Sequence, residues 1–175
     1  MSRKIVINLF GGPGYGKSTF ASYLFYKFKT NDVKAELVFE VAKDLIYLTG
    51  IKPPFNQAYV FGNQLFKIER YLEQSDVVIV DSPLLFSIIY NNISYLNHSF
   101  DETVMAAFNS FNNFNLFLDN EFAYSNQGRF QDESDARETH KAIKEFLDGN
   151  QIQYRLINSK NYDEITEEVL RLAKE

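Results

Sequence analysis

A glycine-rich octapeptide, Gly11–Ser18, reads GGPGYGKS and matches the phosphate-binding pattern G-x-x-x-x-G-K-[ST]. In this pattern successive backbone N–H groups turn inward, and with the N-terminus of the following helix they form a nest for an anion. Lys17 would reach the β- and γ-phosphates of a nucleoside triphosphate, and the Ser18 hydroxyl would ligate Mg²⁺. The residues that the motif assigns to nucleotide binding are Gly12, Gly14, Tyr15, Gly16, Lys17, Ser18 and Thr19.

The segments that flank this octapeptide supply the context that the motif requires. Residues 4–10 form a short apolar run with β-branched members, typical of a buried strand, and residues 19–28 suit a helix. A glycine turn that joins a strand to a helix and binds nothing is the alternative. The complete motif with both flanks favours nucleotide binding over that alternative.

Asp81 ends an all-apolar run, Val77–Val80, which has the strongest buried-strand pattern in the chain. A carboxylate there is costly to bury unless it is paired or holds a cation, so we interpret Asp81 as a magnesium-binding and catalytic residue. The alternative is that Asp81 caps a helix that opens at Pro83, although Ser82 is the better candidate for that cap.

Glu40 directly follows a second predicted strand, residues 35–39, and would lie at the same sheet edge as the phosphates. Its carboxylate could take a proton from an attacking hydroxyl and so act on a bound substrate. As a glutamate in the first turn of a helix, it could equally serve to stabilise the helix through a favourable interaction with the helix dipole. The residues alone leave both interpretations open.

Two arginines are candidates for stabilising the charge on a transferred phosphoryl group. Arg129 lies in a polar segment, residues 120–132, placed where a lid could close over the phosphates. Arg137 follows in the next helix and could contact the substrate as a second such group. An ordinary surface arginine is the alternative for both, and it is the weaker interpretation for Arg129.

Polar side chains at the start of a long predicted helix, residues 57–73, are the candidates for binding the acceptor. Gln57 and Tyr59 begin this helix, and Gln64 could read a base or amide edge through paired hydrogen bonds. Because exposed glutamines are common, a solvated surface position is the alternative for Gln64.

These candidate residues depend on strands that alternate with helices along the whole chain. Strands are predicted at residues 4–10, 35–39, 77–81, 115–119 and 153–157, and helices at 19–28, 41–48, 57–73, from 83, at 99–111, 133–148 and 162–174. The alternation predicts one α/β P-loop domain over residues 1–175, with a five-stranded parallel sheet covered on both faces. Ligands of such sheets bind at the carboxyl ends of the strands.

The composition is that of an ordinary globular protein, with 45% hydrophobic residues, a net charge of −5 and no cysteine. The lack of cysteine excludes disulfides, thiolate metal sites and a cysteine nucleophile. No apolar run approaches the ~18 residues of a membrane span, and the first strand begins almost at once, so we expect a cytoplasmic protein without a signal peptide. His98 and His140 stand with no other metal-type ligands, and we assign them no role.

Five segments, taken in order, resemble the AAA-type ATPase/kinase group of small P-loop proteins that is common in tailed bacteriophages. They are the phosphate loop, Phe39–Leu45, Gln57–Gln64, Val78–Pro83 and Gly128–Arg129. That group is similar to the ribosylnicotinamide kinase domain and, more distantly, to nucleoside and nucleotide kinases. The resemblance implies a kinase that uses ATP and Mg²⁺, in which Glu40 and Asp81 organise metal and acceptor and Arg129 belongs to the lid.

The resemblance leaves several acceptors open. Some phage members of the wider kinase group phosphorylate 5-hydroxymethyluridine in DNA, so DNA is an option beside a free nucleoside or nucleotide. A DNA acceptor predicts a basic groove despite the acidic net charge, with Lys43, Lys52 and Lys67 as its candidates. The Asp-Arg-Ser or Asp-Arg-Tyr acceptor motif of deoxynucleoside kinases is replaced here by Asp81–Pro83.

Two rival functions use the same nucleotide site without an acceptor. One is a switch that hydrolyses ATP slowly to control a partner, and the other is an inactive relative that only binds nucleotide. The intact Lys17, Ser18 and Asp81 argue against the inactive relative. The sensor motifs of ring-forming AAA machines are not found, so we expect a monomer or homodimer.

Overall fold

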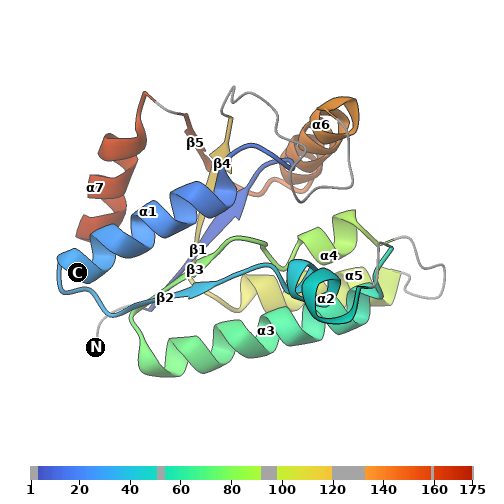
Figure 1. Ribbon diagram of the computed structural model, residues 1–175, viewed down its shortest axis with the longest axis horizontal. Coiled ribbons are helices and arrows are strands. Elements are labelled where there is room, and N and C mark those ends of the chain that lie inside the picture. The colour runs from blue at the N-terminus through green and yellow to red at the C-terminus, as the bar shows by residue number, and fades with distance from the viewer. Residues whose placement is uncertain (1–3, 51–53, 92–97, 120–132, 159, 175) are drawn as a thin grey trace.

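The computed structural model describes residues 4–50, 54–91, 98–119, 133–158 and 160–174, and the structural statements below concern these residues. Five strands form one parallel sheet in the order β2-β3-β1-β4-β5 (Figure 1). The strands are β1 (Ile5–Phe10), β2 (Ala35–Val38), β3 (Val77–Val80), β4 (Asn113–Leu118) and β5 (Arg155–Ile157). The helices are α1 (Lys17–Thr30), α2 (Val41–Thr49), α3 (Gln57–Gln74), α4 (Phe86–Ile89), α5 (His98–Asn109), α6 (Glu133–Gly149) and α7 (Tyr162–Leu172).

The sheet separates two apolar cores, as predicted for a parallel sheet that is covered on both faces. In β1, Ile5, Ile7 and Leu9 pack with α1 and α7, whereas Val6 and Phe10 pack with α3, α5 and α6. Side chains alternate between the faces of a strand, so the six buried residues of β1 serve both cores. Figure 1 shows α1 and α7 on one side of the sheet and α3 and α5 on the other.

Asn8 is a polar residue in the middle of β1, and it is buried. Its Nδ2 donates to the side-chain oxygens of Asn113 and Asn115 on β4, both at 2.9 Å. Because a buried amide is costly unless it is hydrogen-bonded, this pair of bonds permits Asn8 in the core and ties β1 to its neighbour.

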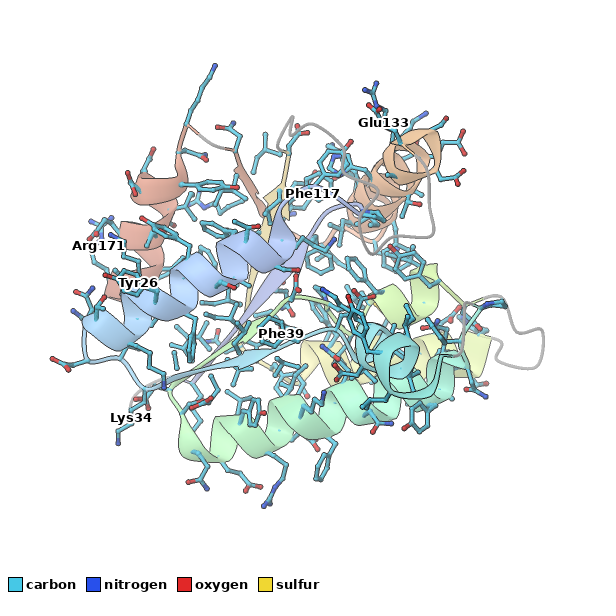
Figure 2. All side chains as sticks on the ribbon, viewed as in Figure 1. Tyr26, Lys34, Phe39, Phe117, Glu133 and Arg171 are labelled. Atoms are coloured by element: carbon cyan, nitrogen blue, oxygen red, sulfur yellow. The ribbon has the colours of Figure 1, made fainter. Side chains whose placement is uncertain are left out.

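Beyond β1, Phe117 of β4 is fully buried, whereas Tyr26 lies exposed on the outer side of α1 (Figure 2).

Six of the described helices begin and end within two residues of their predicted bounds, and the helix after Pro83 differs more. The chain after Pro83 forms the short helix α4, because it first makes i→i+3 turns, such as the bond from Phe86 N–H to the Pro83 carbonyl at 2.9 Å. Helix α5 spans His98–Asn109, so it begins one residue before and ends two residues before the predicted bounds, 99–111. Among the described helices, none combines the length and apolar character that a membrane-spanning segment needs.

Candidate active site

The phosphate loop joins β1 to α1 through a backbone that favours glycine. Gly14 and Gly16 have φ angles of 88° and 82°, in the left-handed region that side chains with a Cβ rarely adopt. Gly16 is the N-cap of α1, and its carbonyl accepts the Phe20 N–H at 2.9 Å. The loop therefore presents its amides at the positive end of a 14-residue helix, which is the arrangement that binds phosphate.

Lys17 folds back over this loop. Its Nζ donates to the carbonyls of Gly11 and Gly12 at 2.8 and 2.9 Å, and it lies 5.7 Å from the centroid of the Phe86 ring. These contacts hold the ammonium group beside the loop amides, where it can pair with an anion that those amides bind.

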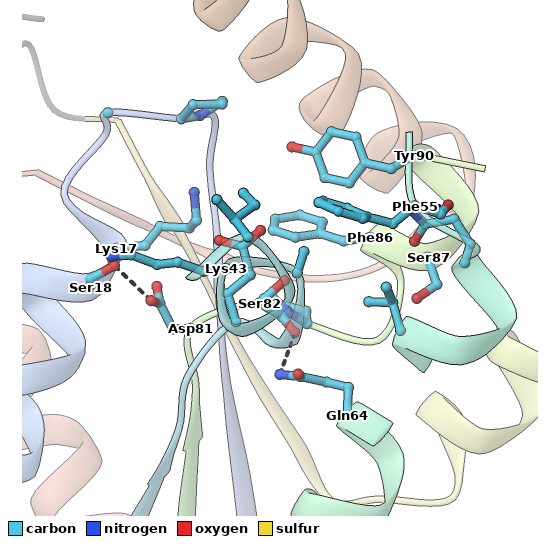
Figure 3. Close-up of a pocket in the computed structure, with 18 of the residues that line it drawn as sticks. Lys17, Ser18, Lys43, Phe55, Gln64, Asp81, Ser82, Phe86, Ser87 and Tyr90 are labelled. Carbon is cyan, nitrogen blue, oxygen red and sulfur yellow. Dashed lines mark hydrogen bonds between the residues drawn. The ribbon is translucent and has the colours of Figure 1, made fainter. Parts of the chain in front are cut away.

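Ser18 and Asp81 meet at the carboxyl edge of the sheet although 63 positions separate them in the sequence. The Ser18 hydroxyl donates to Asp81 Oδ2 at 2.6 Å (Figure 3). Asp81 is buried, and its Oδ1 has no hydrogen-bond partner among the described residues. An unpaired buried carboxylate oxygen is costly, and Mg²⁺ prefers oxygen ligands of this kind, so the pair fits a magnesium ion.

A cavity of about 670 Å³ opens beside this pair and reaches towards α2, α3 and α4 (Figure 3). One wall is the phosphate loop with Ser18 and Asp81, and another is aromatic, with Phe55, Phe86 and Tyr90. The Phe86 and Tyr90 rings pack edge to face with their centroids 5.6 Å apart. The cavity has the size and the mixed lining of a small-molecule site.

Glu40 lines the same cavity at the junction of β2 and α2. It occupies the N-cap position of α2, yet its side chain makes no capping hydrogen bond, so the helix does not use this carboxylate as its cap. Burial raises the pKa of Glu40; the Lys17 ammonium opposes this shift and the Asp81 carboxylate adds to it. A carboxyl group of raised pKa beside a phosphate loop is suited to accept a proton.

Of the three residues of α3 that were predicted to bind the acceptor, two reach the cavity. Gln57 and Gln64 line it and are buried, which excludes the solvated alternative for Gln64. Gln64 Nε2 donates to the Ser82 carbonyl at 2.9 Å (Figure 3), whereas its Oε1 has no hydrogen-bond partner among the described residues and is open to a ligand donor. Tyr59 is 54% exposed and does not line the cavity, because two residues along a helix turn it roughly to the face opposite Gln57.

The two predicted arginines have different outcomes. Arg137 is exposed on α6, pairs with Glu133 at 2.7 Å and does not line the cavity, as its surface alternative predicts. Arg129 and the predicted lid at residues 120–132 lie outside the described residues.

His140 of α6 contacts the phosphate loop, and sequence reasoning does not identify it. Its Nδ1 accepts the Gly12 N–H at 3.1 Å, and its ring stacks on Tyr15 with centroids 3.6 Å apart and planes 7° apart. A Cβ on Gly12 would lie 2.7 Å from the His140 Cβ, so the helix packs directly on the loop. No local pattern signals these contacts, because they join positions 128 residues apart.

Comparisons with known proteins agree with this fold. A family model described as an AAA domain matches residues 6–164. The solved structure of thymidylate kinase from Ehrlichia chaffeensis has a TM-score of 0.65 and 14% identity, covering 97% of this chain and 98% of that one. The structure of APE1195 has a TM-score of 0.50 and 16% identity, covering 99% and 96%. No curated protein matches the sequence. At these identities the structural likeness establishes the fold, a five-stranded P-loop α/β domain.

Proposed function

We propose that this chain, which belongs to the AAA domain family, is an ATP-dependent phosphotransferase. Its acceptor would be a nucleoside, a nucleotide or a hydroxymethylated pyrimidine in DNA, and Mg²⁺ would assist transfer of the γ-phosphoryl group. The chain would act as a monomer or homodimer, with residues 120–132 as a lid that brings Arg129 to the phosphates.

One observation carries this proposal: the elements of a donor site and an acceptor pocket line a single cavity. Lys17, Ser18 and Asp81 lie on the side of the phosphate loop, and Glu40 and Gln57 lie on the side of α2 and α3. A nucleotide-dependent switch needs the first group of residues but has no use for a second set of polar side chains in the same cavity. The second group therefore favours a kinase over the switch.

The chain's own residues suit phosphoryl transfer, which depends mainly on positioning and electrostatics. Lys17 would move from the loop carbonyls to the phosphates of ATP. Ser18 and Asp81 would hold Mg²⁺, which neutralises charge on the phosphates. An acceptor hydroxyl would attack the γ-phosphorus, the bond to the bridging oxygen of ADP would break, and Glu40 would receive the hydroxyl proton.

The acceptor half of the cavity is suited to a planar ring. Phe55, Phe86 and Tyr90 offer aromatic surface, and burial raises the pKa of the Tyr90 hydroxyl, with Glu40 adding to the shift. Among the candidates for a basic groove, Lys43 lines the cavity, whereas Lys67 pairs with Asp44 at 2.9 Å. Lys52 lies outside the described residues. The pairing of Lys67 weakens the DNA version relative to a free nucleoside or nucleotide.

Transfer of label from [γ-³²P]ATP tests the proposal directly. The panel would contain nucleosides, nucleotides, ribosylnicotinamide and hydroxymethylated DNA. We expect label on one class of acceptor, and label that appears only as free phosphate across the panel would refute the kinase function in favour of the switch.

Lys17→Ala tests the role of the phosphate loop in the same assay. It should abolish transfer without unfolding the protein, because Lys17 is partly exposed and its hydrogen bonds to Gly11 and Gly12 are accepted by backbone carbonyls. Lys29→Ala is the matched control, since Lys29 lies in the last turn of the same helix in an exposed pair with Glu36. Full activity of Lys17→Ala would contradict the proposed site.

A further inference from the structure

One side chain of α6 contacts both ends of the first turn of the phosphate loop, residues 12–15. His140 Nδ1 accepts the N–H of Gly12, which begins the turn, and its ring stacks on Tyr15, which ends it. The turn also closes on itself through the Tyr15 N–H and the Gly12 carbonyl, at 3.4 Å. Lys17 donates to that same carbonyl and to the Gly11 carbonyl, which belongs to the same peptide group as the Gly12 N–H, so His140 and Lys17 both bind the Gly11–Gly12 peptide.

The hydrogen bond to Gly12 determines the protonation state that His140 must have. A ring nitrogen that accepts a hydrogen bond carries no proton, so the neutral imidazole holds its proton on Nε2. Nε2 lies 3.5 Å from the Asp119 carboxylate at the end of β4, which favours this tautomer. Protonation of Nδ1 would set two N–H groups against each other and break the bond to Gly12.

The charged and titratable groups around the ring come from each element that packs against it. Tyr15 belongs to the loop, Lys17 to α1, Asp119 to the end of β4 and Lys144 to the next turn of α6. The side chain of His140 is only 13% exposed. Burial lowers the pKa of His140; Asp119 opposes the shift and Lys17 adds to it. The imidazole is therefore neutral near pH 7.5.

We propose that His140 is a positioning residue for the phosphate loop, whose Nδ1 holds residues 12–15 in the conformation that binds ATP. A loop that is already ordered loses less conformational freedom on binding, so removal of the acceptor should lower the affinity for ATP. Protonation should have the same effect. The proposal rests on the proposed function in one respect, that ATP is the ligand of the loop.

Two substitutions separate the hydrogen bond from the aromatic stack. His140→Phe keeps a ring against Tyr15 but removes the acceptor, and His140→Asn keeps an acceptor near the position of Nδ1 but does not titrate. At pH 8 we expect His140→Phe to bind MgATP about fivefold more weakly, the size of one neutral hydrogen bond, and His140→Asn to bind more tightly than His140→Phe. His98→Phe and His98→Asn are the controls, because His98 is exposed on α5 and paired with Glu102.

The pH profile of MgATP binding gives a readout that a purely structural role would not change. Wild type should lose more affinity for MgATP than His140→Asn between pH 8 and pH 5.5. Protonation of ATP affects both proteins equally, so it cancels when their affinities are compared. Unchanged affinity in His140→Phe, together with equal pH profiles for wild type and His140→Asn, would overturn the proposal. Thermal unfolding of each variant at pH 8 reports whether it is folded.

A measurement on the protein alone distinguishes failure of this proposal from failure of the proposed function. Long-range ¹H–¹⁵N spectra should show an unprotonated Nδ1 at pH 7.5, and hydrogen exchange at the Gly12 amide should accelerate in His140→Phe. A proton on Nδ1, or exchange that does not change, would refute the positioning role. If wild type binds no ATP while both results hold, the proposed function is the one that fails.

Discussion

Two carboxylates face one cavity, and their surroundings give them different chemistry. Asp81 accepts the Ser18 hydroxyl, and its other oxygen has no partner in the described part of the chain, which suits a metal ligand. Glu40 makes no capping bond and has a pKa raised by burial, which suits a proton acceptor. The sequence identifies both side chains because each follows a predicted strand. Which of them is suited to bind a metal and which to accept a proton depends on neighbours that lie far away in the chain.

Glu40→Gln should separate catalysis from stability. We expect transfer to a hydroxyl acceptor to fall about 10²–10⁴-fold, because the proton acceptor is lost. The folded pKa of Glu40 is raised, so its stabilising contribution is present at low pH and is lost as pH rises through that pKa. Glutamine avoids this loss, so the melting temperature should increase at pH 8 and much less at pH 5.

Transfer rates and melting curves from pH 5 to pH 8.5 check this prediction. Wild-type transfer should decline on acidification, and the midpoint of this decline should lie above the pKa of an ordinary glutamate. Glu36→Gln is the control, because Glu36 is a half-exposed glutamate on β2, the strand that precedes Glu40. A melting temperature of Glu40→Gln that falls at pH 8 would contradict the prediction.

Asp81→Asn should increase the Mg²⁺ concentration needed for half-maximal transfer. The substitution keeps the size of the side chain but removes the charge that would attract the cation, and we expect an increase of more than about tenfold, or 1.4 kcal/mol. A titration of transfer with Mg²⁺ measures it. Asp32→Asn is the control, since Asp32 sits in an exposed turn at a φ of 58° that asparagine also adopts. Equal Mg²⁺ dependence in both variants would exclude Asp81 as a ligand.

At the scale of elements, the close packing of α6 on the phosphate loop explains why Gly12 is glycine. The spacing of the motif assigns Gly12 to phosphate binding, but the structure gives it a packing role. A Cβ there would lie 2.7 Å from the His140 Cβ and 2.8 Å from the Ala136 carbonyl oxygen. A helix backbone cannot move aside as the tip of a flexible side chain can, so this contact determines where α6 sits.

Gly12→Ala and Gly62→Ala should therefore have effects of opposite sign. Gly12→Ala should destabilise the protein by about 1–3 kcal/mol through overpacking and should weaken ATP binding. Gly62 lies exposed in α3 with open space where a Cβ would be, so alanine should stabilise by roughly 0.5–1 kcal/mol. Urea unfolding measures both changes. A neutral Gly12→Ala would mean that α6 can move away from the loop.

The boundaries of elements could be predicted only where local signals mark them. Asn56 accepts hydrogen bonds from the N–H groups of Ala58 and Tyr59, and α3 begins at Gln57 as its apolar periodicity predicts. Gly50 ends α2 at a φ of 68°. The short α4 was beyond such reasoning, because Phe86 is positioned by its packing in the core and by an edge contact with Phe10.

At the scale of the whole molecule, one parallel sheet brings the ends of β1, β2 and β3 to a common edge. The loop after β1, Glu40 after β2 and Asp81 after β3 therefore line one cavity. The order β2-β3-β1 places Asp81 on the strand between the other two. A ligand that spans the edge contacts several elements at once, so its binding should stabilise the entire domain.

MgATP should increase the melting temperature of the folded domain. At a concentration of 100 times its dissociation constant, ligand binding stabilises by about 2.7 kcal/mol, which corresponds to about 5–10 °C for a chain of this size. Differential scanning calorimetry with MgATP, Mg²⁺ alone and no addition measures the shift. Lys17→Ala should show a much smaller one, and an equal shift in that variant would place the nucleotide elsewhere.

Features that depend on contiguous residues could be predicted from the sequence. The phosphate loop is a run of backbone groups with its own lysine and serine, and the alternation of apolar runs predicts the parallel sheet and the strand ends that precede Glu40 and Asp81. Which side chains reach the cavity depends on the tertiary structure. It brought in Gln57 and Gln64, left Tyr59 and Arg137 outside, and set His140 on the loop, because side-chain contacts depend on how helices distant in sequence pack against the sheet.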